Sequence, residues 1–353
     1  MTGEIRVVLA EDSPTVRRHL INIISSTPDM TVVGEARDGA EAVRMVEDLR
    51  PDVVSMDINM PDLDGLEATR LIMEHSPTPI VVVSDLLDVD VNLSLQAIEA
   101  GALAVVGKPP HQHSPEYENK QQHLLKTLRA MAAVKVISRR RPRHGKRSTA
   151  EMQGIGVVRA DTKIPRPEII VIGASTGGPG ALLKLLGELP KNPSVPIVIV
   201  QHMSDEFIYG LARWLSSVTE HHVMLALDNM VLEKGMIVLA PGDANLTIVR
   251  DNGILMTQLN RVTGHSRYMP SVDSLFESVA DTAGKRAVGI ILTGMGDDGA
   301  KGLLAIRKAG GYTLVQDESS STVFGMPRAA IQIGAASKVV PLADLSSKIR
   351  KML

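Results

Sequence analysis

The chain has 353 residues and a formal net charge of −2, so it is too long for one ordinary hydrophobic core and too evenly charged for a dedicated nucleic-acid-binding protein. It contains no cysteine, which excludes disulfides, thiolate catalysis and cysteine-ligated metal sites. Residues 1–20 carry too many charges for a signal peptide, and no apolar run is long enough to insert into a membrane. We therefore expect a soluble, cytoplasmic protein with two domains.

The first part of the chain repeats a β/α pattern. Short apolar runs predict strands at residues 5–9, 31–35, 53–56, 80–83 and 103–106. Amphipathic stretches predict helices at residues 16–25, 40–49, 65–74, 91–100 and 121–137. This alternation is typical of a parallel sheet with helices on both faces, in the α/β fold class.

Polar side chains follow four of these expected strands, at the point where each strand ends. They are Glu11, Asp12, Asp57, Ser84 and Lys108. The carboxyl ends of parallel strands meet at one edge of a sheet, where three carboxylates repel one another unless a cation lies among them. Hard oxygen ligands suit Mg²⁺, and a carboxylate beside Mg²⁺ and a lysine can accept a phosphoryl group.

These residues resemble the receiver domain of response regulators, over about residues 4–130. The resemblance rests on the acidic pair before Ser13, the stretch at residues 57–65 and the lysine followed by Pro109. It implies a flavodoxin-like fold in which Asp57 accepts phosphate from a histidine kinase. It also implies that Ser84 and Lys108 contact the phosphoryl group, and that Mg²⁺ is held by Asp12, Asp57, the backbone carbonyl of Asn59 and, through water, Glu11.

The sequence departs from this family at one position. Receiver domains usually carry Phe or Tyr three residues before the lysine, and here that residue is Val105. The usual aromatic rotamer switch therefore cannot operate in its usual form. An inward movement of Ser84, with a shift of the helix that follows its strand, remains as the route by which phosphorylation acts.

A basic segment separates the two halves of the chain. Residues 139–147 hold six cations together with Pro142 and Gly145, which is typical of an extended linker. Binding of nucleic acid or of an acidic protein surface is the alternative, but no aromatic residues are interleaved with the charges and the overall charge is nearly neutral. We expect a receiver domain at residues 1–137, a linker at 138–165 and a second α/β domain at 166–353.

Ser175 follows a buried strand that is expected to end at a Gly-rich turn, before a helix at residues 179–189. A serine at such a junction is presented at the carboxyl edge of a sheet, which suits a nucleophile. A phosphate-cradling loop or a simple tight turn would give the same pattern. A dinucleotide-binding loop is disfavoured, because the next strand ends in Gln201 and His202 instead of an acidic residue.

Two further expected strands, at residues 196–200 and 288–292, supply partners for this serine. His202 follows the first strand and Asp298 follows the second. A serine, a histidine and a carboxylate at one sheet edge are the parts of an acyl-transfer triad, and the backbone N–H of Met295 could meet an oxyanion. The G-x-S-x-G pattern fits α/β-hydrolases, but their chain order of serine, acid and histidine does not.

This half resembles the catalytic domain of the chemotaxis protein-glutamate methylesterases, over about residues 167–350. The resemblance rests on residues 173–179, 201–203, 269–273, 293–300 and 324–330. It implies a Rossmann-like α/β domain in which Ser175 is the nucleophile, His202 the general base and Asp298, instead of Asp297, the orienting acid. It also implies that Met295 contributes to the oxyanion hole and that Thr176 forms a hydrogen bond near the catalytic pair.

The combined resemblance implies a phosphorylation-activated hydrolase. Its substrates would be methylated glutamates on the cytoplasmic helices of chemoreceptors, with glutamine deamidation as a second activity and no cofactor for the ester chemistry. The unphosphorylated receiver would pack over the Ser175 cleft, and the protein would be a monomer that inserts into no membrane. Two alternatives stay open: a signalling adaptor with an inactive esterase-like domain, and an array that does not control swimming.

Overall fold

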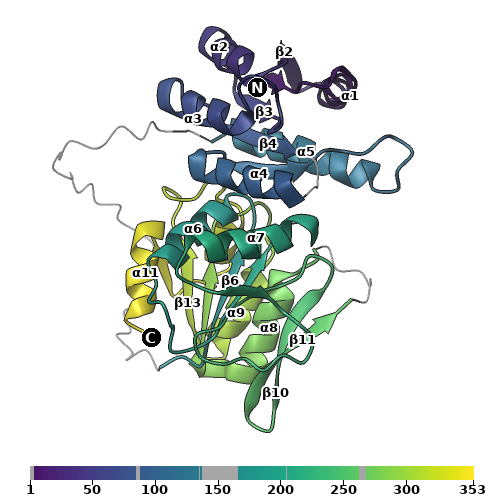
Figure 1. The fold of residues 1–353 in the computed structure, drawn as a ribbon. Helices are drawn as coiled ribbons and strands as arrows, with labels where there is room; N and C mark the ends of the chain where they lie inside the picture. The colour runs from purple at the N-terminus through teal and green to yellow at the C-terminus, as the bar shows by residue number, and fades with distance from the viewer. Residues whose placement is uncertain (1–3, 85–87, 135, 137–165, 204, 262–267) are drawn as a thin grey trace, which may run out of the picture.

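Two parallel sheets organise the chain (Figure 1). The computed structural model describes residues 4–84, 88–134, 136, 166–203, 205–261 and 268–353. The expected basic linker at residues 138–165 lies outside the described residues, so the domain boundaries stay predictions. No helix among the described residues combines the length and the apolar character that crossing a membrane requires.

The first sheet has the strand order β2-β1-β3-β4-β5. This is the flavodoxin-like order, with a switch point between β1 and β3. Its strands are β1 (Ile5–Ala10), β2 (Met30–Ala36), β3 (Val53–Met56), β4 (Ile80–Ser84) and β5 (Ala104–Gly107). Its helices are α1 (Pro14–Ser25), α2 (Gly39–Leu49), α3 (Gly65–His75), α4 (Asp88–Ala100) and α5 (Tyr117–Ala132). The predicted fold class is therefore confirmed for this half.

Local sequence explains where these helices begin. Ser13, Asp38 and Asp64 lie at the N-caps of α1, α2 and α3, and the side chain of each accepts a hydrogen bond from a backbone N–H of the first turn. The helix predicted at residues 121–137 was placed too late in the chain, because α5 begins at Tyr117 and ends at Ala132. A turn closed by the N–H of Tyr117 and the carbonyl of Ser114 leads directly into this helix.

The second sheet has seven strands, all paired in parallel, in the order β14-β13-β12-β6-β7-β9-β8. These are β6 (Ile169–Ala174), β7 (Ile197–Gln201), β8 (Val223–Leu225), β9 (Ile237–Leu239), β12 (Ala287–Ile291), β13 (Tyr312–Gln316) and β14 (Lys338–Val340). The α-helices that the described residues form beside this sheet are α6 (Gly178–Gly187), α7 (Asp205–Val218), α8 (Val272–Ala283), α9 (Ala300–Lys308), α10 (Met326–Gln332) and α11 (Leu342–Arg350).

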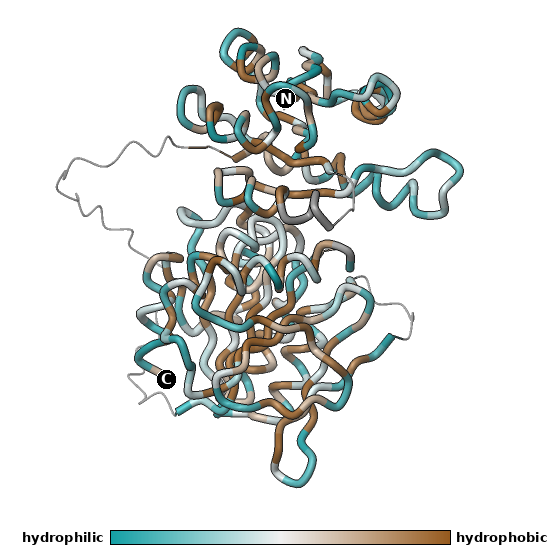
Figure 2. Tube along the Cα trace, viewed as in Figure 1, coloured by the Kyte–Doolittle hydropathy of each residue, from teal (hydrophilic) through white to brown (hydrophobic). Residues whose placement is uncertain are grey.

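The strand β6 lies in the middle of this sheet and is buried along its whole length, as its run of Ile and Val predicts. Figure 2 shows the apolar strands in the interior of both halves. The chain order changes direction at β6, because β7 pairs with one of its edges and β12 with the other. Such a switch point opens a crevice at the carboxyl ends of the strands. Ser175, His202 and Asp298 all lie near this edge.

An antiparallel hairpin, formed by β10 (Asn245–Asp251) and β11 (Ile254–Asn260), was not predicted. Its turn holds Asn252 and Gly253, both with positive φ, which is the pairing that a two-residue hairpin turn favours. The hairpin packs on α8, where the N–H of Ile248 donates to Ser278 Oγ at 2.9 Å. It therefore fixes the position of α8 against the sheet.

The helix α4 of the receiver packs against α6 and α7 (Figure 1). Leu95 is fully buried in the core that lies beneath those helices, and Ile98 approaches Gly180 in the first turns of α6. A second contact comes from Val323, which packs against the receiver core. Both contacts involve segments near the carboxyl edge of the second sheet, because α6 begins just after Ser175 and Val323 bonds to Gly294.

Candidate active site

Ser175 lies directly after β6, between the loops that follow β7 and β12. Its backbone N–H donates to the carbonyl of Thr293 at 3.1 Å, and its carbonyl accepts from Gln201 Nε2 at 2.8 Å. The next turn has Gly177 at φ +77, packed so tightly on Thr322 that a Cβ there would lie 2.5 Å from it. Both neighbouring strands therefore hold the serine at the start of α6.

His202 directly follows the neighbouring strand β7, as Ser175 directly follows β6. Ala174 pairs with Gln201 in the β6–β7 register, and the N–H of His202 donates to the carbonyl of Ala174 at 2.9 Å. Nε2 of the ring lies 2.8 Å from Asp298 Oδ2, which leaves Nδ1 for a second partner. Among the described residues, no hydrogen bond joins the Ser175 hydroxyl to this ring; such catalytic bonds are often loose before substrate binds.

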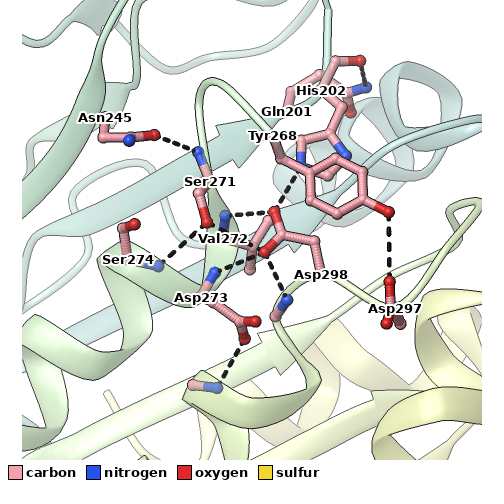
Figure 3. A network of polar contacts seen from close by, with 12 residues as sticks. Gln201, His202, Asn245, Tyr268, Ser271, Val272, Asp273, Ser274, Asp297 and Asp298 are labelled. Atoms are coloured by element: carbon pink, nitrogen blue, oxygen red, sulfur yellow. Dashed lines mark hydrogen bonds and ion pairs between the residues drawn. The ribbon is translucent and has the colours of Figure 1, made fainter. Parts of the chain in front are cut away.

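The carboxylate of Asp298 is held at the N-terminus of α8 (Figure 3). Besides His202, it accepts hydrogen bonds from the backbone N–H groups of Val272 at 2.7 Å, of Asp273 at 3.0 Å and of Gly299 at 3.0 Å, and from Ser271 Oγ at 3.1 Å. Burial alone would raise the pKa of Asp298, but the hydrogen bond and charge of His202 and the backbone donors hold it below its ordinary value. The carboxylate is therefore fixed in its ionised form.

Residues around Asp298 form a supporting layer whose roles the sequence did not reveal. The backbone N–H of Ser271 donates to Asn245 Oδ1 at 2.8 Å, so the hairpin strand β10 helps to hold the start of α8. Asp273 accepts from the N–H of Gly302 at 2.7 Å, and burial raises the pKa of Asp273. A serine followed two residues later by an acid, before an apolar run, is a helix N-terminus signal that could have indicated this arrangement.

Asp297 does not contact the histidine by any described hydrogen bond, and its Oδ1 instead accepts from the hydroxyl of Tyr268 at 3.3 Å. The tyrosine ring stacks on the His202 ring, with centroids 5.1 Å apart and an angle of 3° between the planes (Figure 3). Sequence reasoning missed this tyrosine. The structure thus brings Asp298 to His202 and directs Asp297 elsewhere.

The loop after β12 closes the other side of Ser175. A Cβ at Gly294 would lie 2.8 Å from Ser175 Cβ, so only glycine permits this approach. The N–H of Gly294 donates to the carbonyl of Val323 at 3.0 Å, which fixes the backbone just before Met295. Thr176, which was expected to bond near the catalytic pair, is held through its backbone carbonyl by Thr293 Oγ1 at 2.9 Å.

A second polar cluster lies at the carboxyl edge of the receiver sheet. Lys108 Nζ lies 3.0 Å from Asp57 Oδ2 and 3.0 Å from Glu11 Oε2, and both carboxylates are almost fully buried. Burial and the charge of Asp57 raise the pKa of Glu11 to about 7, and burial also raises the pKa of Asp57. Burial alone would lower the pKa of Lys108, but the charges of Asp57 and Glu11 raise it. One lysine therefore lies within ion-pair distance of two buried acids.

The oxygens of this cluster fit a divalent cation. Glu11, Asp12 and Asp57 each offer one carboxylate oxygen, and these atoms lie within 4.8 Å of one another. This donor set is the one that Mg²⁺ prefers. Ser84 is the buried last residue of β4, whereas Asn59 lies exposed in the loop after β3. The expected receiver residues thus lie at one sheet edge.

Known proteins resemble the chain over its whole length. Residues 170–349 match the CheB methylesterase family, and residues 7–114 match the response regulator receiver domain family. A protein-glutamate methylesterase/protein-glutamine glutaminase of Myxococcus xanthus is 44% identical over 98% of this chain and 96% of its own length. A protein of the same description from Methanospirillum hungatei is 40% identical over 99% of this chain and 98% of its own length.

The second half also resembles a solved structure. The CheB methylesterase catalytic domain of Thermotoga maritima is 36% identical and covers 53% of this chain and 99% of that domain, with a TM-score of 0.52. This agreement matches the resemblance expected from the Ser175, His202 and Asp298 motifs, and the predicted family is confirmed. The chain belongs to the CheB methylesterase family, in the form that carries a response regulator receiver domain before the hydrolase domain.

Proposed function

We propose that this chain is a phosphorylation-activated protein-glutamate methylesterase and protein-glutamine deamidase that acts on the cytoplasmic helices of chemoreceptors. The observation that carries the proposal is the position of Ser175 beside His202, whose ring is bound to a carboxylate held by four further donors. Serine, histidine and carboxylate in this relationship are the parts of acyl-transfer catalysis. The names of the relatives, protein-glutamate methylesterase/protein-glutamine glutaminase, support glutamyl methyl esters and glutamines of proteins as the substrates.

The reaction follows from the roles of the three side chains. Ser175 Oγ attacks the γ-carbonyl carbon of a glutamyl methyl ester while His202 Nδ1 takes the hydroxyl proton. The imidazolium then gives that proton to the methoxy group, which leaves as methanol. Water attacks the acyl-serine with His202 again as the base, which releases glutamate. With glutamine as substrate, ammonia leaves instead of methanol.

Asp298 and Met295 serve this reaction without forming bonds to the substrate carbon. Asp298 holds the His202 ring with Nδ1 directed away from itself and stabilises the imidazolium. The backbone N–H of Met295, together with other N–H groups of the turn at Ser175, stabilises the oxyanion. Thr176 fixes that turn through its carbonyl bond to Thr293. No cofactor takes part in the ester chemistry that we propose.

Asp57 of the receiver accepts a phosphoryl group from a histidine kinase. Lys108 lies in reach of that carboxylate and would pair with the phosphoryl oxygens, and Ser84 lies at the same sheet edge. Mg²⁺ would be held by Asp12, Asp57, the carbonyl of Asn59 and, through water, Glu11, and when bound it neutralises charge on the phosphoryl group. The buried acids at this edge support the assignment.

The receiver controls the hydrolase through the contact of α4 with α6 and α7. Leu95 and Ile98 pack next to the helix that begins after Ser175, and Val323 links the receiver core to the loop beside Gly294. Phosphorylation of Asp57 weakens this packing and gives the substrate access to the crevice. A monomer is expected, because one chain supplies Ser175, His202 and Asp298 of the proposed site.

Methanol release from methylated receptor membranes tests this function. The full chain should release methanol, and acetyl phosphate with Mg²⁺ should raise the rate. A signalling adaptor with an inactive domain would release none under either condition. Receptors of an array that does not control swimming would serve as substrates equally well. The assay therefore tests ester hydrolysis, whichever cellular response the receptors control.

A further inference from the structure

Tyr268 lies over the face of the proposed general base. Its ring and that of His202 are 5.1 Å apart between centroids and 3° from parallel. This separation lies within the range of offset aromatic stacking. The two residues are far apart in sequence, and the fold brings Tyr268, which lies just before α8, beside the residue that follows β7 (Figure 3).

The hydroxyl of Tyr268 is held on the side away from the histidine. It donates to Asp297 Oδ1 at 3.3 Å, in the loop that carries Met295. The same loop has Gly296 at φ +93, and a Cβ at that position would lie 2.8 Å from the tyrosine hydroxyl. Glycine at 296 therefore leaves the space that the hydroxyl occupies.

A hydrogen bond at Nε2 fixes one point of the His202 ring and leaves rotation about that bond possible. The outer torsion of histidine has a broad energy profile, so the side chain itself does not fix the ring plane. A parallel ring against its face fixes that plane. The face of tyrosine also attracts a cation, which favours the imidazolium that forms when Ser175 loses its proton.

We propose that Tyr268 is a positioning residue that fixes the plane of the His202 ring and ties it, through Asp297, to the loop beside the oxyanion. This inference rests on the proposed esterase function and deepens it. Tyr268 touches the base and not the reacting atoms in this account. Its loss should therefore reduce turnover and leave substrate affinity nearly unchanged.

The test uses the full chain with methylated receptor membranes. Tyr268→Leu and Tyr268→Met should lower kcat about 10- to 100-fold, the cost of a misplaced catalytic group, and change KM less than about twofold. Tyr268→Phe keeps the ring and should retain kcat within about threefold. Tyr209→Leu, at a tyrosine that is exposed on α7, is the matched control and should leave both constants unchanged.

A double-mutant cycle tests the link to Asp297. Asp297→Ala should lower kcat by a few-fold in the wild-type background and have no further effect in Tyr268→Phe. Serine-directed phosphonate labelling measures the reactivity of Ser175 without receptor, and its rate should fall with kcat in Tyr268→Leu. The thermal unfolding midpoint of each variant shows whether the chain is folded.

Three outcomes would overturn the inference. They are an unchanged kcat in the Leu and Met variants, a loss in Tyr268→Phe as large as in Tyr268→Leu, and a rise in KM that accounts for the whole loss. If Tyr268→Leu does not fold, the Phe and Met variants still show whether the ring or the hydroxyl of Tyr268 supports kcat. Absence of turnover and of labelling in the wild-type chain would instead contradict the proposed function.

Discussion

Asp298 Oδ2 lies 2.8 Å from His202 Nε2 and also accepts the N–H of Val272 at 2.7 Å. One oxygen thus joins the histidine after β7 to the first residue of α8. The backbone N–H groups at a helix N-terminus favour a negative charge, so the carboxylate is ionised and immobile before any substrate binds. The geometry of the triad is therefore built into the fold.

Asp298→Asn should lower kcat by roughly 10³- to 10⁴-fold, because the amide cannot hold the histidine in the tautomer that accepts a proton from serine. KM should change little, since Asp298 lies away from the substrate. Steady-state methanol release measures both constants. Asp297→Asn is the matched control, and a loss of kcat there as large as in Asp298→Asn would contradict the choice of orienting acid.

The same carboxylate should make stability depend on pH. Its folded-state pKa lies below the ordinary value of 3.8, so its ionised form contributes stability above pH 3.8, and this contribution is lost as the pH falls through the folded pKa. The difference in urea midpoint between wild type and Asp298→Asn should therefore be largest near neutrality and shrink in acid. A difference that does not vary with pH would argue against this electrostatic role.

The contribution of Asp273 to stability should change with pH in the opposite direction to that of Asp298. Burial raises its folded-state pKa above 3.8, so wild-type stability falls relative to Asp273→Asn as the pH rises through this range. The asparagine oxygen keeps the bond from the N–H of Gly302. Urea unfolding of the two proteins at a series of pH values measures the difference in stability. A stability of wild type that rises relative to that of Asp273→Asn as the pH rises would refute the prediction.

Asp57→Ala should keep the basal esterase rate and lose the activation by acetyl phosphate, because it removes the acceptor and leaves the second sheet intact. Methanol release with and without the phosphodonor measures this. Glu47→Gln, at an exposed position of α2, is the control and should respond as wild type does. Activation that persists in Asp57→Ala would mean that another group accepts the phosphate.

Ile98→Glu should raise the basal rate of the unphosphorylated protein. A charge placed against Gly180 weakens the packing of α4 on α6. A change of about 1.4 to 2.7 kcal/mol in the free-energy difference between the packed and the open arrangement suffices for 10- to 100-fold activation. The variant should also respond less to the phosphodonor. An unchanged basal rate would show that this contact does not restrain the hydrolase domain.

Sequence patterns predicted the five strands of the first sheet and three of the second, β6, β7 and β12, whereas the buried strands β9 and β13 were not predicted. The run of Ile and Val at β6, and its Gly-rich end, indicated both the central strand and the position of Ser175. The predicted range of α5 was wrong, because the amphipathic pattern does not reveal the turn at Ser114 that leads into the helix. The hairpin was missed although Asn252 and Gly253 carried its signal.

The site was predictable where each residue follows a strand, and not where a loop crosses the sheet edge. Ser175, His202 and Asp298 each come shortly after a strand, so their meeting could be expected from a parallel sheet. Tyr268 lies just before α8 and follows no strand of the sheet directly, and its ring nevertheless stacks on that of His202. No local pattern encodes such a contact.

The central claim, that Ser175 is the nucleophile of a glutamyl methylesterase, is tested most directly by methanol release from methylated receptor membranes in wild type and Ser175→Ala. Wild type should release methanol, and Ser175→Ala should release none while keeping the wild-type unfolding midpoint. Turnover by a folded Ser175→Ala protein at the wild-type rate would contradict the account.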